Sequence, residues 1–282
     1  MKPDRRALIA GAGAWLAAGP LRAQDGLALS GRWVQGGFAF GRTWPGATVR
    51  LGDEVVARAS DRGLFVVGFD RDAPATARIE VRAGERSAIR DLSIAAGEFP
   101  SSRIDGLPPS TVEPTDPDLL ARIRREAALK AEGFASREEG DAFRDGFVSP
   151  LPDWRVSSQW GAQRILNGTP ARPHYGIDLA APAGTVISAP ADGRVCLAQP
   201  GLHFEGGLTL LDHGQGLISA YLHQSELLVR EGDRVRRGDP LGKVGQSGRA
   251  TGPHLCWRLK WRDRNLDPSL LIGAKAPNAV SP

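Results

Sequence analysis

The 282-residue chain has few of the side chains that form crosslinks or reactive centres, with only two cysteines and five histidines. Two cysteines allow at most one intramolecular disulfide, between Cys196 and Cys256. After the first 23 residues, no segment is apolar enough to span a membrane. The chain also lacks any stripe of basic and aromatic residues. Its basic residues are dispersed and its acidic ones nearly as many, which excludes nucleic-acid binding.

The net charge is nevertheless positive, at +4 with a pI near 9.4, and 31 of the 36 basic residues are arginine. A basic protein suits a polyanionic environment. For an exported protein, that environment is a cell envelope with acidic glycan and peptide carboxylates.

The first 23 residues have the three-part layout of a signal peptide. Basic residues in 1–6 precede an apolar run over 7–18, and small residues follow up to Ala23. This layout predicts cleavage after Ala23, a periplasmic or secreted protein, and no stable membrane span after cleavage. An uncleaved anchor is the alternative. The pair Arg5-Arg6 is a weak indication of twin-arginine export, so Sec and twin-arginine routes both stay open.

Residues 24–105 predict a β-sandwich accessory domain. Short apolar or alternating runs over 32–40, 47–51, 64–69 and 77–81 are separated by turn residues such as Pro45-Gly46 and Gly52-Asp53. These segments are loosely similar to carboxypeptidase-regulatory or immunoglobulin-like domains. No set of side chains in this region could perform chemistry, so we interpret it as a spacer or binding module.

Residues 106–148 predict a linker and a helical bridge. The helix should begin after Asp116, with aspartate at the cap and Pro117 at the first helical position. Its modest apolar face would comprise Leu119, Leu120, Ile123, Ala127 and Lys130/Ala131, with 124–126 and 137–139 on the solvated side. The segment is too short for a coiled-coil dimer.

The region 149–275 contains the side chains that can hold a metal. His174, Asp178, His223, His254 and Cys256 include three of the five histidines. Imidazole, carboxylate and thiolate are zinc ligands, and a catalytic zinc site uses three of them and leaves a fourth position for water. The set therefore predicts a zinc hydrolase centre.

Spacing adds geometric information to this set. His254 and Cys256 are two residues apart in a partly alternating segment, which predicts a strand with both side chains on one face. His174 and Asp178 are four apart in a segment too rich in Gly and Pro for a helix. Fully extended, they would lie about 13 Å apart. We therefore expect the chain to bend near Gly176.

The pattern His-x3-Asp, Tyr-x-His and Gly-Pro-His-x-(His) resembles the lysostaphin-type or LytM-type murein metalloendopeptidases. The resemblance runs from about Ser149 to Leu271, and three further segments agree with it: 156–161, 189–195 and 229–242. It implies a mostly β protein with a C-terminal antiparallel β peptidase domain behind the sandwich and the bridge. Peptidoglycan would be the substrate.

Carried over residue by residue, the resemblance implies His174 and Asp178 as zinc ligands and His223 and His254 as the catalytic pair. The third ligand would be Cys256, where the family has the second His of His-x-His. A thiolate is itself a good zinc ligand. The alternatives for Cys256 are a buried apolar thiol or a disulfide to Cys196.

Two functions follow from these residues. The first is zinc-dependent hydrolysis of peptide crosslinks in peptidoglycan, with His223 or His254 as proton acceptor. The second is a degenerate, non-catalytic module that binds the wall and activates another murein hydrolase. The remaining histidines have simpler interpretations: His203 as a surface or core residue and His213 as part of a hairpin turn.

Overall fold

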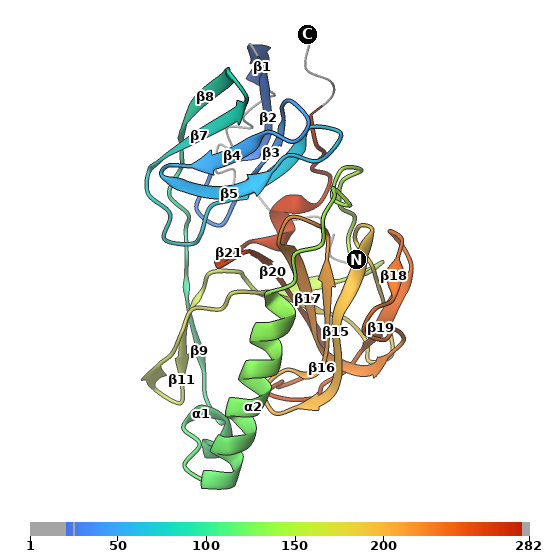
Figure 1. Cartoon of the computed structure of the whole chain (residues 1–282). Helices are drawn as coiled ribbons and strands as arrows, with labels where there is room; N and C mark the ends of the chain where they lie inside the picture. Colours follow the sequence, from blue (N-terminus) through green and yellow to red (C-terminus); the bar gives the residue numbers. More distant parts are fainter. Residues whose placement is uncertain (1–20, 25, 278–282) are drawn as a thin grey trace, which may run out of the picture.

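The computed structural model of the protein describes residues 21–24 and 26–277 (Figure 1). The predicted signal peptide 1–23 lies outside the described residues except for 21–23, which belong to strand β1 (Leu21–Gln24). The chain is mostly β, with antiparallel sheets and one long helix, and this confirms the predicted fold class. None of the helices in the described ranges combines the length and apolar character needed to cross a bilayer.

The N-terminal region is built from two four-stranded sheets. The first has the order β1-β2-β3-β6, and the second has the order β5-β4-β7-β8. After β1, the strands are β2 (Leu27–Arg32), β3 (Phe38–Arg42), β4 (Thr48–Leu51), β5 (Glu54–Arg58), β6 (Leu64–Gly68), β7 (Thr76–Ala83) and β8 (Arg86–Ser93).

One predicted strand of this region is divided. The sequence predicted a single strand over 32–40, but β2 ends at Arg32 and β3 begins at Phe38. The chain turns between them, where Gly36 has φ +83° and the amide of Gly37 donates to the carbonyl of Val34 at 2.7 Å. A left-handed glycine reverses the chain at little steric cost.

The C-terminal region is one ten-stranded sheet with the main order β10-β13-β20-β17-β16-β15-β18. Strands β14 and β19 pair with each other, β19 also pairs with β17, and β21 pairs with β20. The bounds are β10 (Arg155–Ser158), β13 (Ile177–Ala180), β14 (Val186–Ser188), β15 (Gly193–Leu202), β16 (Gly206–Asp212), β17 (Leu217–Leu227), β18 (Arg234–Val235), β19 (Pro240–Val244), β20 (His254–Trp261) and β21 (Arg264–Leu266). The 3-10 helix η1 (Pro268–Leu271) follows.

Between the two regions the chain forms a small sheet and the helical bridge. Strand β9 (Ser101–Ile104) pairs in parallel with β11 (Gln163–Leu166), which also pairs with β12 (Thr169–Pro170). After the short α1 (Pro109–Val112), α2 (Pro117–Phe134) lies along β15 (Figure 1). Its cap is as predicted, since the carboxylate of Asp116 accepts from the amide of Leu119 at 2.7 Å.

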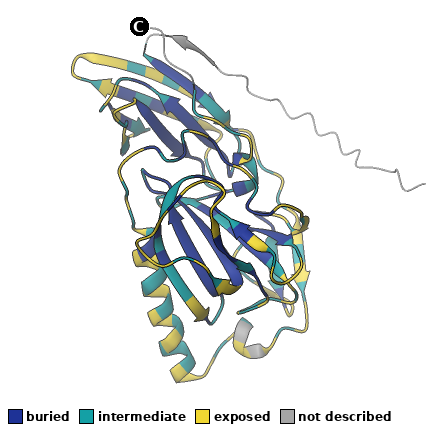
Figure 2. Ribbon diagram, turned by 90° about the vertical axis from the view of Figure 1, so that its right-hand side faces the viewer, coloured by how far each residue is buried: buried dark blue, intermediate teal, exposed yellow. Residues whose placement is uncertain are grey.

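The two β regions share one apolar core. Phe38, Phe40 and Phe65 of the N-terminal sheets belong to the same buried cluster as Trp261 and Leu266 of the C-terminal sheet. Figure 2 shows buried strands in both regions, whereas α2 is largely half-buried or exposed. Because burial of apolar area stabilises folded structure by about 25 cal/mol per Å², the contact holds the regions together.

Candidate metal centre

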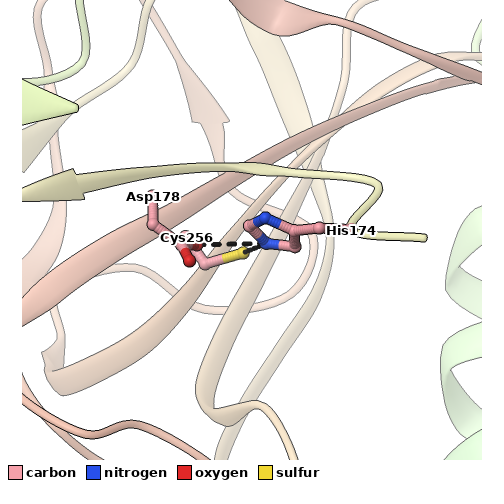
Figure 3. Close-up of side chains that lie close together, drawn as sticks. All are labelled: His174, Asp178 and Cys256. Carbon is pink, nitrogen blue, oxygen red and sulfur yellow. Dashed lines mark hydrogen bonds and ion pairs between the residues drawn. The ribbon is translucent and has the colours of Figure 1, made fainter. Parts of the chain in front are cut away.

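The three predicted zinc ligands lie together in the C-terminal region. One ligand atom from each of His174, Asp178 and Cys256 falls within 4.8 Å of the others, and all three residues are buried. His174 Nε2 lies 3.3 Å from Cys256 Sγ and 3.1 Å from Asp178 Oδ1 (Figure 3). The predicted clustering of these side chains is therefore present.

Sheet register places two of the three. In the antiparallel pair β13/β20, Asp178 lies directly opposite Cys256, and Ala180 opposite His254. Side chains of directly paired residues project to the same face, which brings a carboxylate oxygen of Asp178 and the Cys256 sulfur within 4.8 Å of each other. His254 and Cys256 share β20, as the alternating sequence predicted.

His174 reaches the same point from the loop before β13. Its backbone is fixed by Ala162, whose carbonyl accepts from the His174 amide at 2.8 Å, and by Gly161, whose amide donates to the His174 carbonyl at 2.7 Å. Its Nδ1 lies 3.1 Å from the hydroxyl of Ser158. This contact turns Nε2 toward the other two ligand atoms, in the manner of a metal ligand held by an outer partner.

The chain bends at Gly176, as predicted, immediately before β13. The φ of Gly176 does not lie in the left-handed range, but a Cβ there would meet Cys256 Sγ and Arg258 Cγ, each at 2.8 Å. Only the absence of a side chain allows β13 to start this close to β20.

The two remaining histidines lie beside this cluster. The ring centroids of His223 and His254 are 4.7 Å apart, and His254 Nε2 is 3.8 Å from Asp178 Oδ1. Each Nδ1 faces a backbone carbonyl at 2.8 Å, that of Ser247 for His223 and that of Gly252 for His254. A carbonyl accepts only, so each Nδ1 carries the hydrogen and each Nε2 keeps its lone pair.

His223 reaches this position through an unusual backbone. Its φ is +65°, in the left-handed region that a non-glycine residue seldom adopts. Its neighbour Leu222 pairs with Cys256 across β17/β20 and packs in the same apolar cluster. A regular strand would send the next side chain to the opposite face. The left-handed residue breaks that alternation, so the His223 ring can lie against His254.

Shifts in pKa separate four of these groups into two pairs, His174 with Asp178 and His223 with His254. Burial alone would raise the pKa of Asp178, but His174, His254 and Arg164 outweigh it and hold that pKa well below its usual range. Burial opposes protonation of His174, yet the neighbouring Cys256 and Asp178 raise its pKa. For His223 and His254 burial prevails and lowers the pKa. Both therefore favour the neutral imidazole that can accept a proton.

Two arginines complete the surroundings, and sequence reasoning did not find them. Arg164 on β11 donates from Nη2 to Asp178 Oδ2 at 3.2 Å. Burial opposes the charge of Arg258, but its interactions with the Cys256 side chain, which include a hydrogen bond, outweigh burial and raise the pKa of the guanidinium. Arg258 follows Cys256 by two residues on β20, so strand periodicity could have indicated it.

The donor set fits a zinc ion. Two ligands of one tetrahedral zinc, at about 2.0–2.3 Å from the metal, are separated by roughly 3.3–3.8 Å, close to the distances from His174 Nε2. Asp178 Oδ1 is buried and has no well-aligned hydrogen-bond donor in the described ranges. Three electron-rich atoms this close need a shared cation or proton between them.

The other candidate residues lie apart from this cluster. Both cysteines are free thiols, and Cys196 Sγ contacts the carbonyl of Leu210 at 3.6 Å, so the alternative of a Cys196–Cys256 disulfide is not realised. His203 is half-buried, and its Nε2 lies 3.3 Å from the carbonyl of Ser110. His213 begins the turn to β17 and is fully buried.

Comparison with known proteins assigns the class. The sequence profile of peptidase family M23 matches residues 172–268, which hold all five groups. A solved Pseudomonas aeruginosa structure, described as a peptidase M23, is 31% identical over 86% of this chain and 96% of that one, with a TM-score of 0.65. This chain belongs to peptidase family M23, and the resemblance to LytM-type peptidases is confirmed.

Curated relatives match a shorter part of the chain. Peptidoglycan DD-endopeptidase ShyA of Vibrio cholerae is 35% identical over 158 residues, or 55% of this chain and 36% of ShyA. DD-carboxypeptidase/endopeptidase Mpg of Neisseria meningitidis is 35% identical over 135 residues, or 46% of this chain and 31% of Mpg. The matches thus span about a third of these relatives' length.

Proposed function

We propose that this protein is a zinc-dependent endopeptidase that hydrolyses peptide crosslinks of peptidoglycan. The observation that carries the proposal is the arrangement of three converging ligand atoms beside two neutral imidazoles. The substrate class is taken from the relatives ShyA, a peptidoglycan DD-endopeptidase, and Mpg, a DD-carboxypeptidase/endopeptidase. Location in the periplasm or outside the cell rests on the predicted signal peptide 1–23 and on the substrate.

His174, Asp178 and Cys256 would hold the metal. Bound there, zinc would supply the Lewis acidity that polarises a water molecule and the carbonyl of the scissile bond. Asp178 is kept anionic by its neighbours, and Arg164 on its other oxygen orients the carboxylate. The chain thus supplies a deprotonated oxygen, an imidazole and a thiol of restricted orientation.

The imidazoles supply the proton transfers. His223 and His254 each bear a lone pair on Nε2, so either can accept the proton of the attacking water. Once protonated, the same Nε2–H can donate to the developing oxyanion or to the leaving amine. No serine or cysteine nucleophile is needed.

One observation favours the second candidate function, a non-catalytic module that binds the wall and activates another murein hydrolase. Arg164 and Arg258 contact Asp178 and Cys256, so the two acidic ligands already have cationic partners without a metal. A cluster neutralised in this way can persist as a structural feature.

One experiment separates the two functions. The full chain is purified under reducing conditions, its zinc content is measured, and it is incubated with crosslinked muropeptides. About one zinc per chain together with cleavage supports the peptidase. Zinc without cleavage, or neither, supports the module.

A further inference from the structure

The helix α2 carries a row of polar side chains that contact the hairpin between β15 and β16. Arg122, Glu126 and Lys130 are spaced four residues apart and therefore share one face of the helix. Arg122 donates to the carbonyl of Gly201 at 2.6 Å and to Glu126 at 2.7 Å. The other oxygen of Glu126 accepts from the amide of His203 at 2.8 Å. We call Arg122, Glu126 and Lys130 the α2 ladder.

The last contact of the ladder is a largely buried ion pair. Lys130 Nζ lies 2.5 Å from Glu205 Oε1, and the two side chains are 19% and 11% exposed. Charges removed from water are costly unless they are paired, so the loss of one partner leaves the other strongly destabilised. One turn further, α2 packs so closely that a Cβ on Gly133 would lie 2.8 Å from Leu210. The helix is thus fixed both to the hairpin and to the sheet below it.

The hairpin in turn holds His223. The carbonyl of Glu205 accepts from the His223 amide at 2.8 Å. The amide of Gly207 donates to the Ser247 hydroxyl at 3.0 Å, and the carbonyl of Ser247 accepts from His223 Nδ1. Backbone and ring of His223 are therefore both tied to the hairpin, the first directly and the second through Ser247.

His223 needs such support because its backbone is strained. A non-glycine residue at positive φ is sterically unfavourable and persists only where the surrounding structure imposes it. If the hairpin moved, the Glu205 carbonyl would release the His223 amide. The residue could then relax to extended geometry, which turns its ring away from His254.

We propose that the α2 ladder positions the His223 imidazole for proton transfer by holding the hairpin 201–207 in place. This proposal rests on the proposed peptidase function for its kinetic consequences, but its structural part stands on the contacts alone. Residues 117–134 lie outside the segment that matches the family profile, so the peptidase centre would depend on the preceding helical bridge.

The test uses the full-length protein and the variants Lys130→Met, Lys130→Arg and Arg125→Met. Arg125 is an exposed arginine of the same helix, so Arg125→Met removes the same charge away from the ladder. We expect Lys130→Met to lower kcat about ten- to a hundred-fold, as a shift of about 1 Å in a reacting group does. Its KM and zinc content should stay within about two-fold, because neither the substrate nor the metal is touched. Lys130→Arg and Arg125→Met should keep kcat within about three-fold.

A double variant distinguishes positioning from general damage. In Lys130→Met/Glu205→Gln no buried charge is left unpaired, so kcat should recover at least about three-fold relative to Lys130→Met alone. Arg122→Met removes the contacts with Gly201 and Glu126, and Glu126 keeps its hydrogen bond from the His203 amide. This variant should lower kcat in the same direction by a smaller factor, and it keeps the test open if Lys130→Met does not fold.

Amide hydrogen exchange gives a readout independent of hydrolysis. In Lys130→Met the amide of His223 should exchange about ten-fold faster or more, while strands of the N-terminal sheets stay unchanged. Unchanged exchange at His223, unchanged kcat, or an equal loss in Arg125→Met would overturn the proposal. If the wild-type protein hydrolyses no muropeptide, the peptidase function fails and exchange alone decides the positioning role.

Discussion

The two β regions of this protein differ in what they bury. In the N-terminal sheets, residues 27–94, the buried side chains are almost all apolar, with Thr43 as the polar exception in the described part of that region. The C-terminal region buries His174, Asp178, Glu205, Thr209, Asp212, His213, Ser219, His223 and Gln224. Both regions consist mainly of antiparallel strands, so secondary structure does not distinguish them.

The free-energy cost of burying polar groups explains why the region with buried polar side chains is the one that can carry the functional site. A buried polar group costs free energy unless it finds a partner, and a buried charge costs more. The N-terminal sheets avoid the cost and keep their charges outside, for example in the exposed pair Arg78–Asp91. The C-terminal region meets the cost with arginines and backbone carbonyls around a cluster of ligand-type side chains. The apolar region therefore provides stability, and the polar one can perform chemistry.

The largest expected effect comes from removing one ligand. Asp178→Ala or His174→Ala deletes one of three protein ligands, so zinc content should fall from about one per chain to less than about a tenth, and hydrolysis should stop. Asp91→Ala is the matched change in the N-terminal sheets and should alter neither. Metal analysis of the three purified variants checks this, and full zinc in the Asp178 or His174 variant would refute the ligand assignment.

Loss of an imidazole should separate chemistry from metal binding. His223→Ala and His254→Ala each remove a proton acceptor, which typically lowers the rate by about 10²–10⁴-fold. Zinc content should stay close to that of the wild type, since neither ring belongs to the converging set. Muropeptide turnover and metal content are measured on the same samples. A variant that loses its zinc would show that its imidazole is a ligand.

Cys256 can be tested by its replacements. Cys256→His supplies another good zinc ligand and should retain the metal, whereas Cys256→Ser offers only a neutral hydroxyl. Outer-shell changes already weaken metal sites by about 10–100-fold, so loss of a ligand should weaken zinc binding roughly ten-fold or more. Competition with a chelator measures this. Equal affinity in Cys256→Ser and the wild type would favour the simple packing role.

Much of the centre could be predicted because strand periodicity is a local property. His254 and Cys256 two residues apart on one strand, and a bend between His174 and Asp178, required no knowledge of distant segments. Arg164 could not be predicted in this way, since it reaches Asp178 from a different strand, β11. Such a contact depends on tertiary packing and leaves no mark in the spacing of residues.

The helical bridge α2 shows the same limit of prediction from local sequence. The cap at Asp116 was predicted from local signals, but Glu126 was assigned to the solvated side and Lys130 to the apolar face. Glu126 instead accepts from His203, and Lys130 pairs with Glu205. Polar residues on a helix face indicate solvent only when no polar partner lies opposite, and sequence alone did not reveal that partner.

The shared core gives a prediction that leaves the metal untouched. Leu266 is fully buried and its side chain lies against Gly68 of the N-terminal sheets, where an added Cβ would come within 2.9 Å of it. Leu266→Ala should lower the free energy of unfolding by about 2–5 kcal/mol through the cavity it leaves. Denaturant titration measures the loss, and zinc content should be unchanged. A variant that loses metal without losing stability would mean that the core positions the centre.

The smallest expected effect comes from His213, a buried polar residue of the C-terminal region that contacts the shared apolar core. His213 packs edge-on against Phe147 of that core, with ring centroids 5.0 Å apart. Its Nδ1 donates to the carbonyl of Asp192 at 2.7 Å, and its Nε2 accepts from Ser219 at 2.8 Å. Ser219 lies 2.7 Å from the hydroxyl of Tyr221. This network is satisfied by a neutral imidazole, and protonation would place a second donor opposite Ser219.

Burial lowers the pKa of His213 from 6.5 to about 4. Between these values the unfolded chain binds a proton that the folded protein does not. Stability from His213 is therefore complete above about pH 6.5, falls as the pH is lowered, and is lost below about pH 4. The total is on the order of 3 kcal/mol. His213→Gln should be less stable than the wild type at pH 7, and the difference should shrink toward pH 4. Unfolding curves at several pH values measure it, and a constant difference would show that His213 is not protonated on unfolding.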